Sequence, residues 1–137
     1  MTPRQIDAFF YGLFMDAAVL RQAGAKPSNF RRAHVADFAL RIGQRATLVP
    51  SLGARAYGML VSLTHAELEQ LYGAPGLEAY RPEAVLAHAS EGGTVSALCY
   101  NLVQAPEPHE RNPEYAKRLR SVLENLGFPA EYIASVT

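Results

Sequence analysis

The sequence has little cysteine, no excess charge of either sign and no long hydrophobic run, and each absence excludes a class of protein. Its 13 basic and 13 acidic residues cancel, which is not the charge balance of a protein that binds nucleic acid or anionic membranes. The one cysteine, Cys99, excludes an internal disulfide framework, and no CxxC or HExxH spacing indicates a metal site. Cys99 lies in the apolar stretch 95–100, so we interpret it as a small buried hydrophobic residue rather than a nucleophile.

The hydrophobic residues also lack the arrangement of a targeting or membrane segment. The N-terminus has no basic flank followed by an apolar core and a cleavage site, and no apolar run approaches the length that spans a bilayer. We therefore expect a cytoplasmic protein with neither membrane nor nucleic-acid partners. The 137 residues are enough to bury a core and contain no repeat or linker, so we predict a single domain over residues 1–137.

The stretch 8–16 is the first feature with a chemical implication. Strand-forming apolar residues lead to Gly12, and Asp16 then begins a segment that is typical of a helix. A strand that turns at glycine into a helix exposes backbone N–H groups, which can hold a carboxylate or an oxyanion. The alternative is a buried first strand whose glycine only lets the chain turn. The junction alone does not separate these two interpretations.

The next part of the chain predicts strands. Gly, Pro and Asn make 23–29 a loop, and the loose alternation at 31–49 favours two short strands broken near Gly43. A turn is predicted at 50–53 because it combines Pro, Ser and Gly. The apolar run 56–63 then has the composition of a buried strand.

A helix and a hairpin follow. Thr64 and Glu67 have the spacing of a capping box, and the helix that they begin is predicted to end at Gly73. Strands are predicted at 80–88 and 94–103, and they should pair antiparallel because so few residues connect them. Pro82, inside the first of these strands, favours an edge position or a bulge.

The C-terminal part is predicted to be helical. Asn112 followed by proline is a typical helix start, the helix covers 114–125, and Gly127 follows its end. A last short helix begins near Pro129. Antiparallel strands with helices packed outside them place the chain in the α+β class.

Three segments of the chain resemble the γ-glutamylcyclotransferase (AIG2-like) family, and they occur in the family's order. Residues 10–12 match its early strand ending in Tyr-Gly, and residues 58–85 are similar to its strand, its helix ending before a glycine, and its "Tyr-x-Arg-x-x-Val" strand. Residues 112–115 and 126–133 are similar to its C-terminal pattern "Pro-x-x-Tyr … Gly-Leu-Pro-x-Glu-Tyr-Ile". No one segment is specific, but together they span most of the chain.

The resemblance implies a small mixed β-barrel with flanking helices and a cavity at one end. It also implies a transferase activity, in which a γ-glutamyl group cyclises to 5-oxoproline and releases an amine or amino acid. The substrate carries its own nucleophile, since its α-amino group attacks the γ-carbonyl, and a carboxylate in the cavity would move the proton. The expected partner is a small molecule with a γ-glutamyl or related group, and we expect no cofactor.

The resemblance also assigns candidate residues. The ligand-binding candidates are the loop after the first strand and two tyrosines, namely Tyr11, Gly12, Leu13, Phe14, Tyr80 and Tyr115. Leu13 and Phe14 stand where family members often carry a small polar pair, which makes that end of the cavity more apolar. The family's catalytic glutamate precedes the glycine at the end of the middle helix, and Tyr72 occupies that position here.

Replacement of the glutamate by Tyr72 leaves two hypotheses for function. A tyrosine of ordinary pKa is a poor base at neutral pH, so an enzyme would need another carboxylate, and Glu78 in the following loop is the nearest candidate in sequence. In this first hypothesis the protein is a cyclotransferase with a relocated acid/base and an altered substrate. In the second, it is a non-catalytic small-molecule-binding module that retains the fold and cavity.

Overall fold

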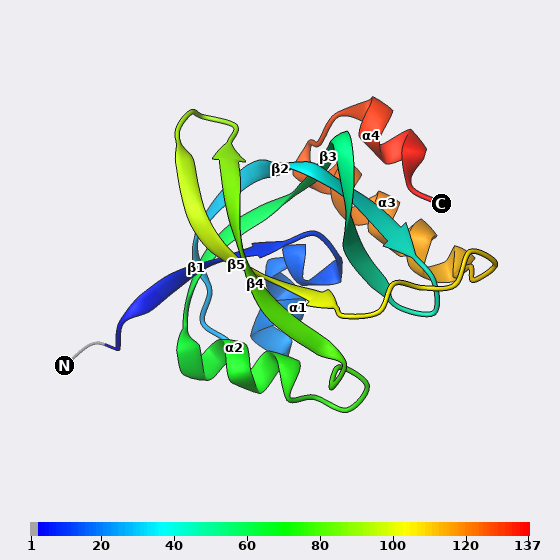
Figure 1. Ribbon diagram of the computed structural model, residues 1–137. Helices are drawn as coiled ribbons and strands as arrows, with labels where there is room; N and C mark the ends of the chain where they lie inside the picture. The colour runs from blue at the N-terminus through cyan, green and yellow to red at the C-terminus, as the bar shows by residue number, and fades with distance from the viewer. Residues whose placement is uncertain (1–2) are drawn as a thin grey trace.

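The two longest elements, β2 (Ser28–Ile42) and β3 (Ala46–Thr64), form a hairpin, and the other strands close it into a barrel (Figure 1). The remaining strands are β1 (Gln5–Phe10), β4 (Tyr80–Ala89) and β5 (Thr94–Leu102). The computed structural model describes residues 3–137. β1 pairs antiparallel with β3 and parallel with β5, so the order β1-β3-β2-β4-β5 returns to its start. This confirms the predicted α+β class with a small mixed barrel.

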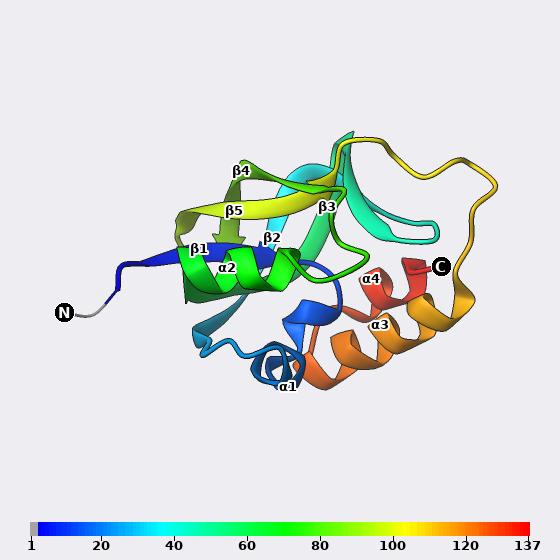
Figure 2. The ribbon, with the colours of Figure 1, turned by 90° about the horizontal axis from the view of Figure 1, so that it is seen from below.

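Short helical segments cover the outside of the barrel. They are η1 (Leu13–Met15), α1 (Ala17–Gln22), α2 (His65–Tyr72), α3 (Pro113–Leu126) and α4 (Ala130–Ser135). Helices α3 and α4 lie side by side near the C-terminus, whereas α2 lies on another side of the barrel, toward the N-terminus (Figures 1 and 2). Of the helices within residues 3–137, none is both long and apolar enough to cross a membrane.

The prediction of short strands and a turn at 50–53 is wrong, because β3 continues through this segment. Asp37 has a left-handed φ of 65°, and the register between β2 and β3 shifts beside it. Its carboxylate accepts the N–H of Gly53 at 2.8 Å. The proline and glycine therefore belong to an irregular bend within a long hairpin and do not reverse the chain. The chain reverses between Ile42 and Ala46, as the break predicted near Gly43 requires.

The predicted helix caps and the predicted β-hairpin are confirmed. Thr64 and Glu67 form a complete capping box at the start of α2. The side chain of Asn112 accepts the N–H of Tyr115 at the start of α3, and Gly127 ends that helix with a φ of 80°. β4 and β5 pair antiparallel along their whole length. The first half of β4, with Pro82, pairs with β5 alone, which is the predicted edge position.

The core fills the barrel and continues beneath the helices. Its fully buried side chains include Phe9, Leu60 and Leu63 from the strands and Leu20, Leu119 and Leu123 from the helices. Burying each side chain of this size contributes roughly 1.5–3 kcal/mol. Cys99 is buried as predicted, and burial raises the pKa of its thiol to about 12, which supports its interpretation as a packing residue.

Candidate ligand-binding cavity

A cavity of about 310 Å³ lies where β1 ends, and we call it the tyrosine cavity. Its walls are the segments 10–14 and 44–46 together with Val19, Tyr72, Leu77, Tyr80 and Tyr115. These residues come from the strand–loop junction after β1, from α1, from the β2–β3 reversal, from the end of α2 and its following loop, from the start of β4, and from α3. Closure of the barrel and packing of the helices bring these distant segments together. A volume of this size is within the range of small-molecule sites.

Gly12 lets the loop approach α3. A Cβ atom on Gly12 would lie 2.4 Å from the hydroxyl oxygen of Tyr115, closer than side-chain atoms pack. The loop then forms the single turn of η1, in which the N–H of Met15 donates to the carbonyl of Gly12 at 3.0 Å. Asp16 caps α1 by accepting the N–H of Ala18 at 2.9 Å. The strand–glycine–helix junction predicted from the sequence is thus present, with a short 3-10 turn inserted.

Aromatic rings pack tightly on one side of the tyrosine cavity. The ring of Tyr72 stacks on Tyr100 with centroids 3.9 Å apart and an interplanar angle of 7°. Phe14 meets Tyr72 edge-on at 5.6 Å, and Tyr80 lies 5.8 Å away at a tilt. The capping box fixes where α2 begins, and α2 then ends with Tyr72 against these rings.

The hydroxyl groups of these tyrosines have different surroundings. Tyr11 donates to the carbonyl of Tyr100 at 2.7 Å, and Tyr80 donates to the carbonyl of Ala46. Within residues 3–137, the hydroxyl of Tyr72 forms no hydrogen bond, and the one fully buried side-chain polar atom without a partner is the hydroxyl of Tyr132, outside this cavity. Burial raises the pKa of Tyr72 well above 10.0 and the pKa of Tyr80 to about 12. Both phenols are therefore neutral at neutral pH, and the hydroxyl of Tyr72 is free to bond a ligand.

Among the lining residues that the structure describes, Arg45 carries the one formal charge, and none is Asp, Glu, His or Cys. The side chain of Arg45 is exposed and forms no ion pair within residues 3–137. Backbone hydrogen bonds lower the pKa of Glu78, and the charge of Arg45 lowers it further, so the side chains of Glu78 and Arg45 are close enough to interact through space. The tyrosine cavity is thus apolar and aromatic, with a cation at its rim.

All the predicted site residues except Glu78 line this cavity. Glu78 is exposed, and both of its carboxylate oxygens accept the N–H of Gly76 at 3.1 Å. Hydrogen bonds from the backbone N–H of Glu78 itself and from that of Gly76 lower the pKa of Glu78, so this carboxylate stays ionised and turned toward its own loop. The geometry therefore gives no support to proton transfer by Glu78.

Sequence reasoning missed Arg45 and its neighbours Gln44 and Ala46. They lie in the β2–β3 reversal, which appeared in the sequence only as a break near Gly43. The reversal is held in place from far along the chain, because Asn112 donates to the carbonyl of Gln44 at 3.2 Å. No short-range pattern signals a contact between segments this far apart.

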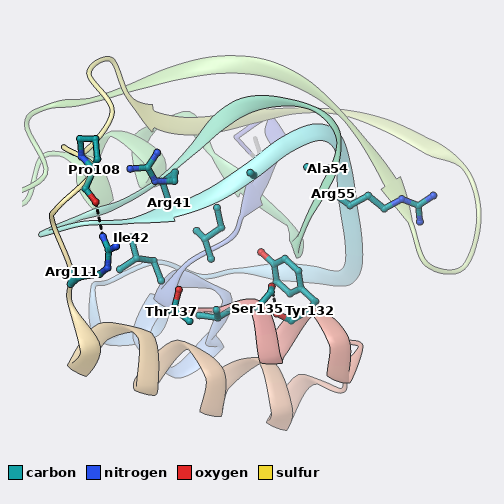
Figure 3. A pocket seen from close by; sticks show the side chains of 12 residues that line it. Arg41, Ile42, Ala54, Arg55, Pro108, Arg111, Tyr132, Ser135 and Thr137 are labelled. Atoms are coloured by element: carbon teal, nitrogen blue, oxygen red, sulfur yellow. Dashed lines mark hydrogen bonds between the residues drawn. The ribbon is translucent and has the colours of Figure 1, made fainter.

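A second, larger cavity of about 520 Å³ lies between the β2–β3 hairpin and α4, and we call it the arginine cavity (Figure 3). Arg41, Arg55 and Arg111 are among its lining residues. Arg41 donates to the carbonyl of Pro106 at 3.4 Å and Arg111 to that of Pro108 at 2.7 Å, while Arg55 extends away from the cavity. Two of its cations thus bond neighbouring carbonyl groups, and the third points elsewhere.

The fold and the tyrosine cavity define a class of protein, a small closed mixed barrel with a ligand-sized cavity at the end of its first strand. The model of the family "Gamma-glutamyl cyclotransferase, AIG2-like" matches residues 8–119, and the chain belongs to this family. This confirms the resemblance found in the sequence. A search of curated protein sequences finds no match.

Solved structures show the same fold. One named gamma-glutamyl cyclotransferase has a TM-score of 0.78 and 20% identity, over 98% of this chain and 89% of that one. An uncharacterised human protein has a TM-score of 0.76 and 21% identity, over 97% and 88% of the two chains. YkqA from Bacillus subtilis has a TM-score of 0.76 and 23% identity, over 97% of this chain and 55% of its own. At these identities the similarity concerns the fold.

Proposed function

We propose that the tyrosine cavity binds a small molecule with a γ-glutamyl or related group, and that the chain catalyses little or no cyclisation of it. The observation that carries this proposal is the set of lining residues. The sequence resemblance puts Tyr72 at the position of the family's glutamate, and within residues 3–137 no carboxylate lines the cavity. The cavity has the features of a binding site without those of a proton-transfer site.

The chemistry of cyclisation explains why the carboxylate matters. The α-nitrogen of the substrate forms a bond to the γ-carbonyl carbon, and the bond from that carbon to the leaving nitrogen breaks. The attacking ammonium must first lose a proton, and the leaving nitrogen must gain one. The phenol of Tyr72, with its pKa raised by burial, does not accept that proton at neutral pH. Orientation in the cavity would remain, but the general base would be missing.

The competing function is a cyclotransferase in which Glu78 has taken over the proton transfer. Glu78 lies in the loop that follows α2, and Arg45 at the cavity rim is close enough to lower its pKa. This function would require Glu78 to leave its hydrogen bonds with Gly76 and enter the cavity. This hypothesis names a specific proton-transfer group, and one assay distinguishes it from binding without catalysis.

The test is to incubate purified protein with a panel of γ-glutamyl amides and glutaryl amides that carry apolar amines. Calorimetry measures binding, and chromatography measures 5-oxoproline and free amine. We expect saturable binding of panel members and no 5-oxoproline above the uncatalysed amount. Enzymatic release of 5-oxoproline would contradict the proposal. If Glu78→Gln abolished that release and Tyr72→Phe did not, the base would be Glu78.

We also propose a cytoplasmic location. The free, buried thiol of Cys99 supports it, because a reducing compartment is where a single unpaired cysteine is common.

A further inference from the structure

We infer that the tyrosine cavity selects ligands that carry a carboxylate and no ammonium group, so that glutaryl amides bind better than the corresponding γ-glutamyl amides. The inference rests on the proposed function, because it takes the tyrosine cavity as the ligand site. It goes further by stating the charge of the ligand. The two ligand types differ by one group, the α-ammonium, and the walls of the cavity treat that group differently from the carboxylate.

The charges around the cavity favour an anion. Arg45 is the charged lining residue, and within the described part of the chain its guanidinium has neither an ion pair nor a side-chain hydrogen bond. Glu78 is close enough to interact with Arg45 through space, but both of its oxygens accept the N–H of Gly76 and it forms no ion pair with Arg45. Glu110 accepts the N–H groups of Gln44 and Glu107. A guanidinium without a partner at the rim of an apolar cavity is suited to a ligand carboxylate.

An ammonium has no comparable partner there. Burying a cation without an opposite charge or enough acceptors costs free energy, and Arg45 would add repulsion. Aromatic rings can hold cations on their faces, but one face of Tyr72 is already occupied by another ring. One face of Tyr72 stacks on Tyr100 at 3.9 Å, and the edge of Phe14 packs near its ring. Phe14, Tyr72 and Tyr80 therefore pack against one another along one wall of the cavity.

The remaining walls define the other end of the ligand. Phe14, Val19 and Leu77 present apolar side chains, and the hydroxyl of Tyr72 can bond the amide group of a ligand. A carboxylate at one end, an amide in the middle and an apolar amine at the other end match this arrangement. Glutaryl benzylamide has these three parts and lacks the ammonium.

The test compares three ligands that share one carbon chain and differ in their charged groups. Glutaryl benzylamide has a carboxylate alone, γ-glutamyl benzylamide has a carboxylate and an ammonium, and the methyl ester of glutaryl benzylamide has neither. Calorimetry on the wild-type protein should give a dissociation constant for glutaryl benzylamide about tenfold or more below that of either other ligand, a difference typical of one charged hydrogen bond. Equal or tighter binding of γ-glutamyl benzylamide would overturn the inference while leaving the proposed function intact. Failure of every ligand to bind would instead reject the proposed function.

Variants of two exposed arginines locate the effect. Arg45→Gln should weaken binding of glutaryl benzylamide about tenfold and leave binding of the methyl ester nearly unchanged. Arg55→Gln, at the arginine cavity, is the matched control and should change neither affinity. Equal losses for the acid and the ester in Arg45→Gln would mean that Arg45 acts through packing, and this result would overturn its assignment as the carboxylate partner.

Discussion

The tyrosine cavity and the arginine cavity, two of the cavities of this barrel, differ in the chemistry of their walls as well as in size. The arginine cavity is larger, at about 520 Å³ against about 310 Å³, but Arg41 and Arg111 already bond backbone carbonyl groups. The tyrosine cavity is smaller, yet Arg45 and the hydroxyl of Tyr72 have no partner within residues 3–137. The arginine cavity also contains a group without a partner, the buried hydroxyl of Tyr132. What distinguishes the tyrosine cavity is that its lining includes every residue that the family resemblance assigned except Glu78, whereas the lining of the arginine cavity includes none of them.

The largest effect should come from placing a carboxylate in the tyrosine cavity. Tyr72→Glu should raise the rate of 5-oxoproline release from γ-glutamyl benzylamide by between about 10²-fold and 10⁴-fold over the wild-type protein, because the variant supplies a general base. Chromatography of 5-oxoproline in single-substrate assays measures the change.

Two variants control for this result. Tyr72→Gln has nearly the same shape as Tyr72→Glu but no base, so it should stay inactive while folding equally well. Ser135→Glu adds a carboxylate to the arginine cavity and should also stay inactive. If Tyr72→Glu is folded and still releases no 5-oxoproline, the position of Tyr72 is not the family's base position.

A second prediction compares two glycines of β3, one beside the tyrosine cavity and one at the far bend. A Cβ on Gly58 would lie 2.2 Å from the carbonyl oxygen of Phe10, whereas a Cβ on Gly53 meets nothing within 4 Å. Gly58→Ala should therefore lower the free energy of unfolding by about 3 kcal/mol. Gly53→Ala creates no steric clash and only places alanine at a φ of 84°, so it should lower the free energy of unfolding by about 1 kcal/mol.

Urea denaturation of both glycine variants measures the difference. Equal losses would show that β1 and β3 separate easily beside the cavity, which would contradict the close packing of these two strands.

The elements that the sequence predicted well are those specified by neighbouring residues. The capping box of Thr64 and Glu67, the cap at Asn112 and the β4–β5 hairpin each depend on residues a few positions apart. The segment 50–53 was misinterpreted because proline and glycine signal a turn, and only pairing with Asp37 on β2 makes it a bend in a strand.

The candidate site was predictable to the extent that the family pattern covers it. The loop 11–14, Tyr80 and Tyr115 were named from the sequence and line one cavity. Arg45 was not, because its contact with the cavity follows from closure of the barrel and leaves no local pattern. The side-chain direction of Glu78 was equally inaccessible, since it depends on hydrogen bonds to Gly76.

A third prediction concerns α2 and α3, the helices that carry Tyr72 and Tyr115 of the tyrosine cavity. Thr64→Ala removes the N-cap of α2, which ends at Tyr72, and should lower the free energy of unfolding by about 1 kcal/mol. Asn112→Ala removes the N-cap of α3, which carries Tyr115, and should cost about the same. Thermal denaturation followed by circular dichroism measures both. A loss below the error of that measurement for Thr64→Ala would mean that tertiary packing alone fixes the start of α2.

The smallest effect on stability is expected from a change of pH near neutrality, because the buried tyrosines titrate only at high pH. Tyr80 lines the tyrosine cavity and Tyr132 the arginine cavity, and burial raises the pKa of each from 10.0 to about 12. Folding therefore favours the protonated phenols, so their contribution to stability is complete below pH 10 and is lost as the pH rises toward 12. Unfolding measurements with tyrosinate absorbance should show this loss. A loss of stability that tracks tyrosine ionisation well below pH 10 would contradict the burial of these rings.

The comparison of the two cavities is tested most directly by amide NMR of the wild-type protein during titration with glutaryl benzylamide. The account predicts saturating shifts at the backbone amides of Gly12, Leu13 and Arg45, with Ser135 and Val136 unchanged. Saturating shifts at Ser135 and Val136, with the loop at Gly12 unchanged, would place the ligand in the arginine cavity and contradict the account.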